Sequence, residues 1–231
     1  MRRRLLFFLL AALAAGVAAF WLTLPDVAPL ATGFPKTTAF MELRKQQLRT
    51  GGRNPVLEYR PVSLSRISPL LRRAVVVAED ARFYEHAGVD WEAVREAAQR
   101  DWKKRRLKVG GSTLTQQLAK NVYLSPARTP WRKLREWAIS RRLESALSKR
   151  RILELYVNVI EFGPRTYGAE AAARRYFGKS AFDLSAREAA ILAAIIPSPR
   201  LYDPARKFSR VEGRAGRILR RMGTVRSRPA C

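Results

Sequence analysis

The stretch GGSTLTQQLAKN, from Gly110 to Asn121, is the feature around which the fold of this chain can be worked out. Two glycines and a serine lead into a helix, an arrangement that suits the binding of an anion by backbone N–H groups. On a helical wheel, Leu114, Leu118 and Val122 share one face, and hydrogen-bonding side chains share another. The polar face consists of Thr113, Gln117, Lys120 and Asn121. An ordinary surface helix is the commoner source of such a stripe, but this one lacks the usual mixture of Glu and Lys, which favours a ligand-facing wall.

Helices are also predicted on both sides of this stretch, because capping residues recur before apolar stripes with helical spacing. The predicted starts are Ser68–Pro69, Thr129–Pro130, Ser148 and the capping box of Ser185 and Glu188. A further short helix is expected from Phe40 to Leu48, and the helix after Ser185 should stop at Pro197. No run is long enough to predict a convincing strand. The fold class is therefore mainly α.

The composition excludes disorder and points to an anionic partner. Of 231 residues, 47% are hydrophobic, which is enough to bury a core. The 45 Lys and Arg residues exceed the 19 Asp and Glu residues and give a net charge of +26. Nucleic acid, acidic lipid headgroups and phosphorylated substrates would all suit this charge. The single cysteine, Cys231, decides no cellular compartment.

The N-terminus predicts a membrane anchor. Three arginines, Arg2 to Arg4, precede an uncharged apolar run from Leu5 to Leu22. At ~1.5 Å per residue, this run is just long enough to cross a hydrocarbon layer of ~30 Å. The basic residues favour a cytoplasmic N-terminus, which places the chain after Pro25 beyond the inner face. A cleaved signal peptide is the alternative, since small residues between Ala14 and Ala18 offer a cleavage site. The continuation of the apolar run beyond them favours the uncleaved anchor.

The predicted organisation is a basic tip and anchor over residues 1–24, a stalk over 25–60, a catalytic domain over 61–222 and a tail over 223–231. The stalk is assigned because residues 25–60 are rich in Pro, Gly and Thr and carry no long apolar periodicity. Within the domain, Trp91 to Lys108 forms an amphipathic segment with a basic run at its end. This segment is a candidate membrane-facing flap, and an ordinary solvated helix is the alternative.

Two adjacent carboxylates stand at the end of a predicted helix, in the stretch EDARFYEHAG from Glu79 to Gly88. Negative charge is unfavourable at a helix C-terminus, and a sequence that accepts this cost often has a functional reason. A solvated turn explains Glu79 and Asp80 equally well on this feature alone. His86 is the only histidine and has no Cys or second His beside it, so we expect a structural hydrogen-bonding residue and no metal site.

A third stretch, WRKLRE, places Arg132 and Glu136 four residues apart on one helix face, with Lys133 beside them. Taken alone, this pattern is best explained by a surface salt bridge. Together with Lys120, however, the two cations would suit a pyrophosphate, because guanidinium groups bind phosphate oxygens in a bidentate way.

The three stretches together resemble the glycosyltransferase family 51 domain, the peptidoglycan transglycosylase module of class A penicillin-binding proteins and of stand-alone enzymes. The matching motifs are EDARFYEHAG, GGSTLTQQLAKN, RKLRE, KRRILELYVN at 149–158 and YGAEAAARRYFGK at 167–179. They follow in the right order and spacing over about residues 60 to 205. Since little chain follows this module, we expect the monofunctional version. One departure is Arg150 and Arg151, where the family often has acidic residues; both are expected to be exposed and of little consequence.

The resemblance implies a lysozyme-like, two-lobed α-helical fold whose groove holds the growing glycan chain and lipid II. It implies that Glu79 is the general base and that Glu136 is the second catalytic carboxylate. It places Lys120, Arg132 and Lys133 around the donor pyrophosphate, and it places Ser112, Thr113, Gln117 and Asn121 along the groove. Asp80, also a candidate substrate-binding residue, is expected to support Glu79 together with Phe83 and His86.

The implied reaction joins the donor's N-acetylmuramic acid to the 4-hydroxyl of the acceptor's N-acetylglucosamine in one inverting step, with undecaprenyl pyrophosphate as leaving group. This leaving group needs charge neutralisation and no acid, so Glu136 need not move a proton and could instead orient Arg132 and Lys133 or hold a metal. No cofactor is expected, although a divalent cation could stimulate the reaction. The expected location is the inner membrane, as a single-pass protein with a periplasmic catalytic domain. The expected partners are lipid II, the nascent glycan, membrane lipids and other cell-wall synthesis proteins, without nucleic acid.

Two other functions compete with this one. A lytic transglycosylase or lysozyme would share the fold and a catalytic Glu, but it would not need cations such as Lys120 and Lys133 for a pyrophosphate. A membrane-anchored scaffold for nucleic acid or teichoic-type polymers would explain the charge of +26. It would not explain Glu79 or the five ordered motifs.

Overall fold

The computed structural model describes residues 2–104, 111–201 and 208–224, and its elements are helices apart from one small sheet. The α-helices are α1 (Arg2–Leu22), α2 (Ala39–Thr50), α3 (Pro69–Glu79), α4 (Trp91–Lys104), α5 (Leu114–Tyr123), α6 (Pro130–Ala146), α7 (Lys149–Val159), α8 (Ala169–Phe177), α9 (Ala186–Ile195) and α10 (Phe208–Thr224). Three short 3₁₀ turns are η1 (Ala28–Ala31), η2 (Leu64–Arg66) and η3 (Ala181–Asp183). The prediction of a mainly α fold is confirmed.

The predicted helix starts are confirmed by capping hydrogen bonds. Ser68 and Ser148 each accept a hydrogen bond from a backbone N–H in the first turn of the helix that follows. Thr129 does the same for α6, with Pro130 as its first residue. Ser185 forms the expected capping box ahead of α9. These side chains satisfy N–H groups that have no partner within their own helix, and this is why each helix begins where it does.

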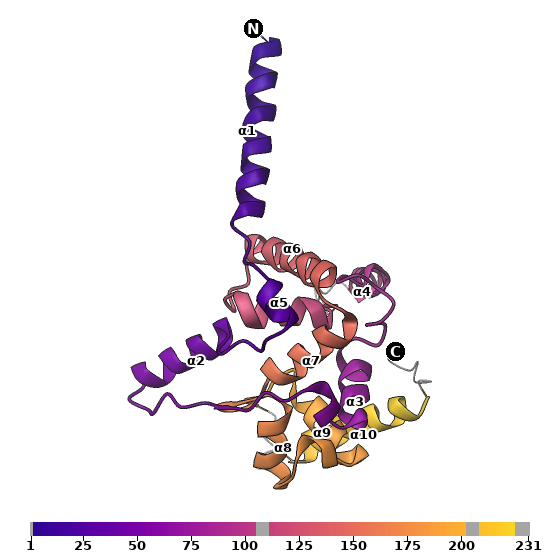
Figure 1. The fold of residues 1–231 in the computed structure, drawn as a ribbon. Coiled ribbons are helices and arrows are strands. Elements are labelled where there is room, and N and C mark those ends of the chain that lie inside the picture. Colours follow the sequence, from indigo (N-terminus) through magenta and orange to yellow (C-terminus); the bar gives the residue numbers. More distant parts are fainter. Residues whose placement is uncertain (1, 105–110, 202–207, 225–231) are drawn as a thin grey trace.

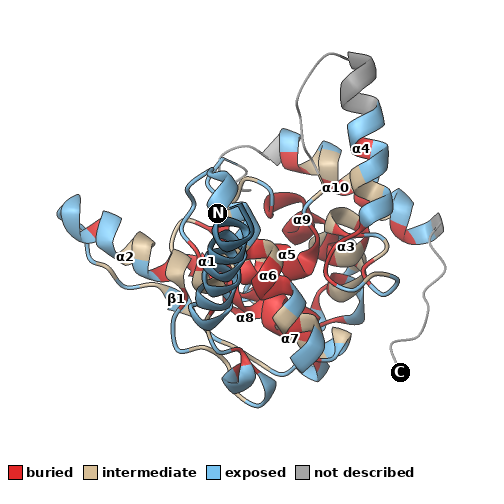
Figure 2. Cartoon of the chain, turned by 90° about the horizontal axis from the view of Figure 1, so that it is seen from above, coloured by how far each residue is buried: buried red, intermediate tan, exposed pale blue. Residues whose placement is uncertain are grey.

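Helix α1 extends away from the rest of the molecule (Figure 1). By length and composition it can cross a membrane, and none of its residues is buried (Figure 2). Both properties are consistent with a single-pass anchor. The amphipathic segment predicted over 91–108 is helical as far as Lys104, and the remainder of its basic run lies outside the described residues.

The domain consists of two groups of helices that meet at α7, a lysozyme-like arrangement (Figure 1). In one group, α5 packs against α6 and α7. In the other group, α9 packs against α3 and α10, and α8 connects this group to α7. Ala, Leu and Ile side chains with little or no exposure fill the centre, including Leu118, Leu155 and Leu192.

A three-stranded sheet lies beside α8. Strand β3 (Thr166–Tyr167) is central, parallel to β1 (Glu58–Tyr59) and antiparallel to β2 (Glu161–Gly163). Strands of two or three residues give no alternating pattern that a sequence could reveal. Through β1, the sheet connects the chain before α3 to the catalytic domain.

Part of the segment predicted as a stalk packs onto the domain. Val27 and Leu30 of the predicted stalk, together with Leu24 just before it, are buried and belong to the main hydrophobic cluster. The short helix expected from Phe40 to Leu48 is present as α2. Three single apolar residues in a Pro-rich segment have no periodicity, so the sequence did not reveal that this segment contributes to the core.

Candidate active site

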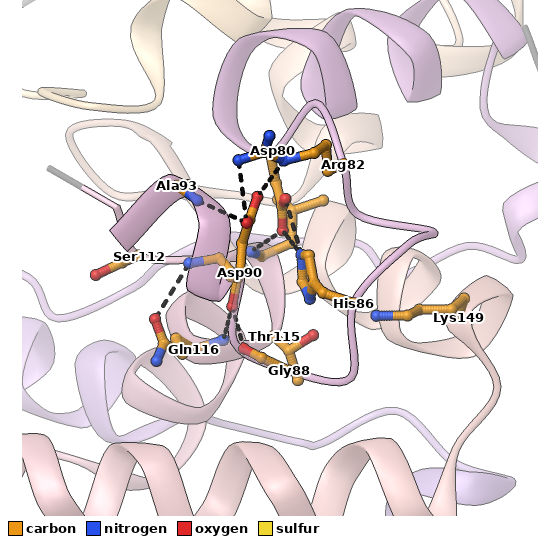
Figure 3. A network of polar contacts seen from close by, with 12 residues as sticks. Asp80, Arg82, His86, Gly88, Asp90, Ala93, Ser112, Thr115, Gln116 and Lys149 are labelled. Carbon is orange, nitrogen blue, oxygen red and sulfur yellow. Dashed lines mark hydrogen bonds and ion pairs between the residues drawn. The ribbon is translucent and has the colours of Figure 1, made fainter. Parts of the chain in front are cut away.

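Asp80 joins the end of α3 to the beginning of α5. Its Oδ2 accepts a hydrogen bond of 2.9 Å from the backbone N–H of Leu114, and its carboxylate lies 3.0 and 3.1 Å from Nε2 of His86 (Figure 3). The N-terminus of α5 favours a negative charge at this position. The unfavourable placement of a carboxylate at the end of α3 is therefore offset by a favourable one at the start of α5.

This connection places Glu79 opposite the second turn of α5. The amide Nε2 of Gln117 donates a 3.0 Å hydrogen bond to Oε2 of Glu79. On its other side, Oε1 of Gln117 accepts a 3.0 Å hydrogen bond from the hydroxyl of Tyr156, which is fully buried on α7. Because an ionised carboxylate only accepts hydrogen bonds, this orientation of the amide requires Tyr156 to be the donor.

Glu79 is surrounded by little water and few charges. Its side chain is 11% exposed, and the nearest cation is Arg214 on α10, whose Nη2 lies 3.6 Å from Oε1. Burial raises the pKa of Glu79, while Gln117, Arg214 and Lys120 partly oppose this shift. A carboxylate with a raised pKa and only one long ion pair, to Arg214, is suited to accepting a proton.

The second carboxylate has the opposite environment. Glu136 on α6 is 2% exposed, and its two oxygens form separate ion pairs with Arg132 and Lys133. Lys133 also donates a 3.2 Å hydrogen bond to Oγ of Ser112. With Lys120, these residues form what we call the cation cluster: Lys120, Arg132 and Lys133 around Glu136.

Lys120 interacts electrostatically with both carboxylates. Burial and the neighbouring Arg132 and Lys133 lower its pKa, while Glu136 and Glu79 oppose that shift. Its ammonium group lies over the ring of Phe40, 5.7 Å from the centroid. Three cations with one carboxylate leave the cluster positively charged, which suits an anion that carries several phosphate oxygens.

Comparison with known protein families identifies the family of this chain. The sequence model of the family described as transglycosylase matches residues 22–223, which is most of the chain. The chain belongs to the transglycosylase family. This transglycosylase is thus a glycosyltransferase enzyme, as its five motifs predicted.

Several known proteins named biosynthetic peptidoglycan transglycosylase are similar over most of their length. The one from Nitrosospira multiformis is 49% identical over 191 residues, which cover 83% of each chain. The one from Thiobacillus denitrificans is 51% identical over 191 residues, covering 83% of this chain and 82% of its own. The one from Chromobacterium violaceum is 43% identical over 226 residues, covering 96% of this chain and 98% of its own.

The structure brings together seven of the residues predicted for the site of this transglycosylase. They are Glu79, Ser112, Gln117, Lys120, Arg132, Lys133 and Glu136. Each of these residues has a direct contact or an electrostatic interaction with another member of the set. What each of them does in the reaction stays a prediction.

Other predicted residues make internal contacts. Thr113 is buried as the N-cap of α5, and its hydroxyl donates a 2.6 Å hydrogen bond to the carbonyl of Gly88. Asn121 is buried and donates a 2.7 Å hydrogen bond to the carbonyl of Gln117. Asp80, His86 and the fully buried Phe83 hold the connection between α3 and α5. Of the four side chains in the polar stripe of α5, therefore, only Gln117 and Lys120 contact or interact with the two carboxylates.

Sequence reasoning missed Tyr156 and Arg214. Tyr156 follows Ile152 and Leu155 on the apolar side of α7 and is fully buried, but its hydroxyl orients Gln117. Arg214 is one of several arginines on α10, and only the packing of α10 against α3 brings it near Glu79. No local pattern could have identified either residue as part of the surroundings of Glu79.

One group of side chains in the described residues has a geometry that could hold a metal ion. Asp80, His86 and Asp90 have ligand atoms within 4.8 Å of one another. Asp90 already accepts hydrogen bonds of 2.9 and 3.1 Å from Arg82, and Asp80 accepts one from a backbone N–H (Figure 3). A guanidinium group therefore already pairs with Asp90, and a backbone N–H already binds Asp80.

Proposed function

We propose that the chain polymerises the glycan strands of peptidoglycan from lipid II. The observation that carries the proposal is the contrast within one site: Glu79 is shielded and has a raised pKa, while the cation cluster next to it is positively charged. One side of such a site can remove a proton, and the other side can bind a departing pyrophosphate. The similar proteins named biosynthetic peptidoglycan transglycosylase support the same function.

The proposed step is a single inverting displacement. Glu79 removes the proton of the acceptor's 4-hydroxyl as that oxygen attacks C1 of the donor's N-acetylmuramic acid. The bond between C1 and the pyrophosphate oxygen breaks, and its electron pair leaves with undecaprenyl pyrophosphate. Since this leaving group is already stable as an anion, it needs positive charge and no proton donor.

The role of Glu136 in this step follows from its contacts. Both of its oxygens are engaged by Arg132 and Lys133, so it holds these cations in place. Lys120, Arg132 and Lys133 then neutralise the leaving group, and we propose that no cofactor is required for it. The anchor α1 would place the domain on the periplasmic side of the inner membrane, where the lipid-linked precursor is consumed.

The test is incubation of the full chain with labelled lipid II in detergent, beside the variant Glu79→Gln. We expect muramidase-sensitive polymer from the wild type and a loss of about 10²–10⁴-fold in the variant. Equal polymer from both proteins would show that Glu79 is not the base. Release of fragments from preformed glycan, without synthesis, would favour a lytic enzyme and overturn the proposal.

A further inference from the structure

The chain between α1 and α2 is fastened to the domain along its first part. We call residues 23–34 the juxtamembrane segment. Its apolar side chains Leu24, Val27 and Leu30 are buried against the core. Its backbone carbonyls are bound by arginines from α6 and α7, and these contacts have no role in the proposed chemistry.

Two arginines of α6 bind the end of α1. Arg142 donates hydrogen bonds of 2.6 Å to the carbonyl of Trp21 and 3.2 Å to that of Leu24. Arg135 donates one of 2.9 Å to the carbonyl of Thr23. The last carbonyls of a helix lack partners within the helix and carry partial negative charge, so guanidinium groups are suitable ligands for them.

A third arginine binds the far end of the segment. Arg151 on α7 donates hydrogen bonds of 2.8 Å to the carbonyl of Leu30 and 2.7 Å to that of Gly33, and its guanidinium lies 4.8 Å from the ring centroid of Phe34. The expectation that Arg150 and Arg151 are both exposed is thus wrong for Arg151, whose side chain is only 15% exposed. This departure from the family pattern has a structural consequence.

The same helix that binds the end of α1 also carries Arg132, Lys133 and Glu136 of the cation cluster. Arg132, Lys133 and Glu136 lie on one side of α6, and Arg135 and Arg142 lie on the side that faces the end of α1. Figure 1 shows α6 directly beside the end of α1. Arg132 and Arg135 are separated along the helix axis by only ~4.5 Å, at ~1.5 Å per residue.

We propose that Arg135, Arg142 and Arg151 are positioning residues that hold the cation cluster at a fixed height above the bilayer, where the diphosphate of a lipid-linked substrate lies. The inference rests on the proposed function. A substrate tethered by its lipid tail presents its diphosphate only within a narrow layer at the membrane surface. A domain fixed in that layer meets the substrate at a high effective concentration, whereas a domain on a loose tether does not.

The kinetic test compares two substrates with the full-length protein in vesicles. The variants are Arg135→Gln combined with Arg142→Gln, and Arg151→Gln; the matched control is Arg141→Gln, an exposed residue of α6. For lipid II in the same vesicles, we expect KM to rise on the order of tenfold in the variants while kcat is kept. For a short-chain, water-soluble analogue, we expect wild-type kinetics, which also shows that the variants are folded. Equal KM for lipid II in all proteins, or equal losses with both substrates, would overturn the proposal.

A second measurement does not depend on activity. Chymotrypsin can cut the bond between Leu30 and Ala31 once the juxtamembrane segment is released, which frees the domain from vesicles. Leu24 and Phe34 are followed by proline and give no cleavage site. We expect slow release for the wild type and for Arg141→Gln, and faster release for the Arg135→Gln, Arg142→Gln double variant and for Arg151→Gln. Unchanged release would refute the fastening itself. Faster release in a protein that makes no polymer would instead refute the proposed function and leave the fastening in place.

Discussion

Two carboxylates of similar burial lie in one site, and their partners make them different groups. Glu79 is 11% exposed and accepts a hydrogen bond from an amide, with its nearest cation 3.6 Å away. Glu136 is 2% exposed and is paired directly with two cations. Burial alone therefore does not decide what a carboxylate does. The first is left able to accept a proton, and the second is committed to holding positive charge in place.

The largest expected effect is on the rate of the variant Glu79→Gln. We expect turnover of lipid II to fall by about 10²–10⁴-fold, because the proton acceptor is lost. We also expect its thermal stability to be equal or higher. A carboxyl whose pKa is raised by folding destabilises the folded state once the pH exceeds its unfolded pKa, and at neutral pH that penalty is present. A lower midpoint of thermal unfolding would contradict this account of Glu79.

The variant Glu136→Gln should show the opposite pattern in stability. It leaves the largely buried Arg132 and the half-exposed Lys133 without their anionic partner, so we expect the free energy of unfolding to fall by about 1–3 kcal/mol. Chemical denaturation beside the exposed control Asp183→Asn measures this difference. If Glu136→Gln were as stable as the control, the two cations would not depend on Glu136, and the contrast with Glu79 would disappear.

A smaller effect is expected for Tyr156→Phe. Without the hydroxyl, Oε1 of Gln117 loses its donor, the amide can rotate, and Glu79 loses its hydrogen bond part of the time. We expect kcat to fall about two- to tenfold, which corresponds to one hydrogen bond of ~0.5–1.5 kcal/mol. Tyr59→Phe removes a phenolic hydrogen bond far from the site and should leave kcat unchanged. Equal kcat in both variants would show that the hydroxyl of Tyr156 has no influence on the action of Glu79.

The smallest expected effect is on the pH dependence of the variant Arg214→Gln. Arg214 lowers the pKa of Glu79, so its loss should raise that pKa and move the acidic limb of the rate profile to higher pH. We expect roughly a two- to fivefold loss at acidic pH, the range for a weak ion pair, and wild-type rates at alkaline pH. The control is Arg217→Gln, an exposed residue of the same helix. A shift of the acidic limb to lower pH would contradict the conclusion that Arg214 lowers the pKa of Glu79.

The helices could be predicted from the sequence because their signals are local. A serine or threonine cap lies next to the turn that it stabilises, so Ser68, Thr129 and Ser185 each identified a helix start. The juxtamembrane segment and Arg151 could not be predicted in this way. Their partners lie 118 to 121 residues apart in the chain, and backbone carbonyls have no sequence signature.

The candidate site was predictable only in part, for the same reason. Glu79, Lys120 and Glu136 were identified because each lies in a motif that resembles the family pattern. Thr113 has the right helical spacing for the polar stripe, but spacing does not distinguish a side chain that caps a helix from one that faces a ligand. Tyr156 was hidden because a tyrosine in an apolar stripe is usually part of the core.

The double attachment of α6 also limits how its length can change. One inserted residue would rotate everything after it by about 100° and shift it by ~1.5 Å along the axis. An insertion between Lys133 and Arg135 would therefore turn either the cations away from Glu79 or the arginine away from the end of α1. A whole extra turn would restore the direction in which each side chain points, but it would increase the distance between the two attachments by ~5.4 Å. Over this stretch, an insertion or deletion therefore disturbs at least one of the two attachments.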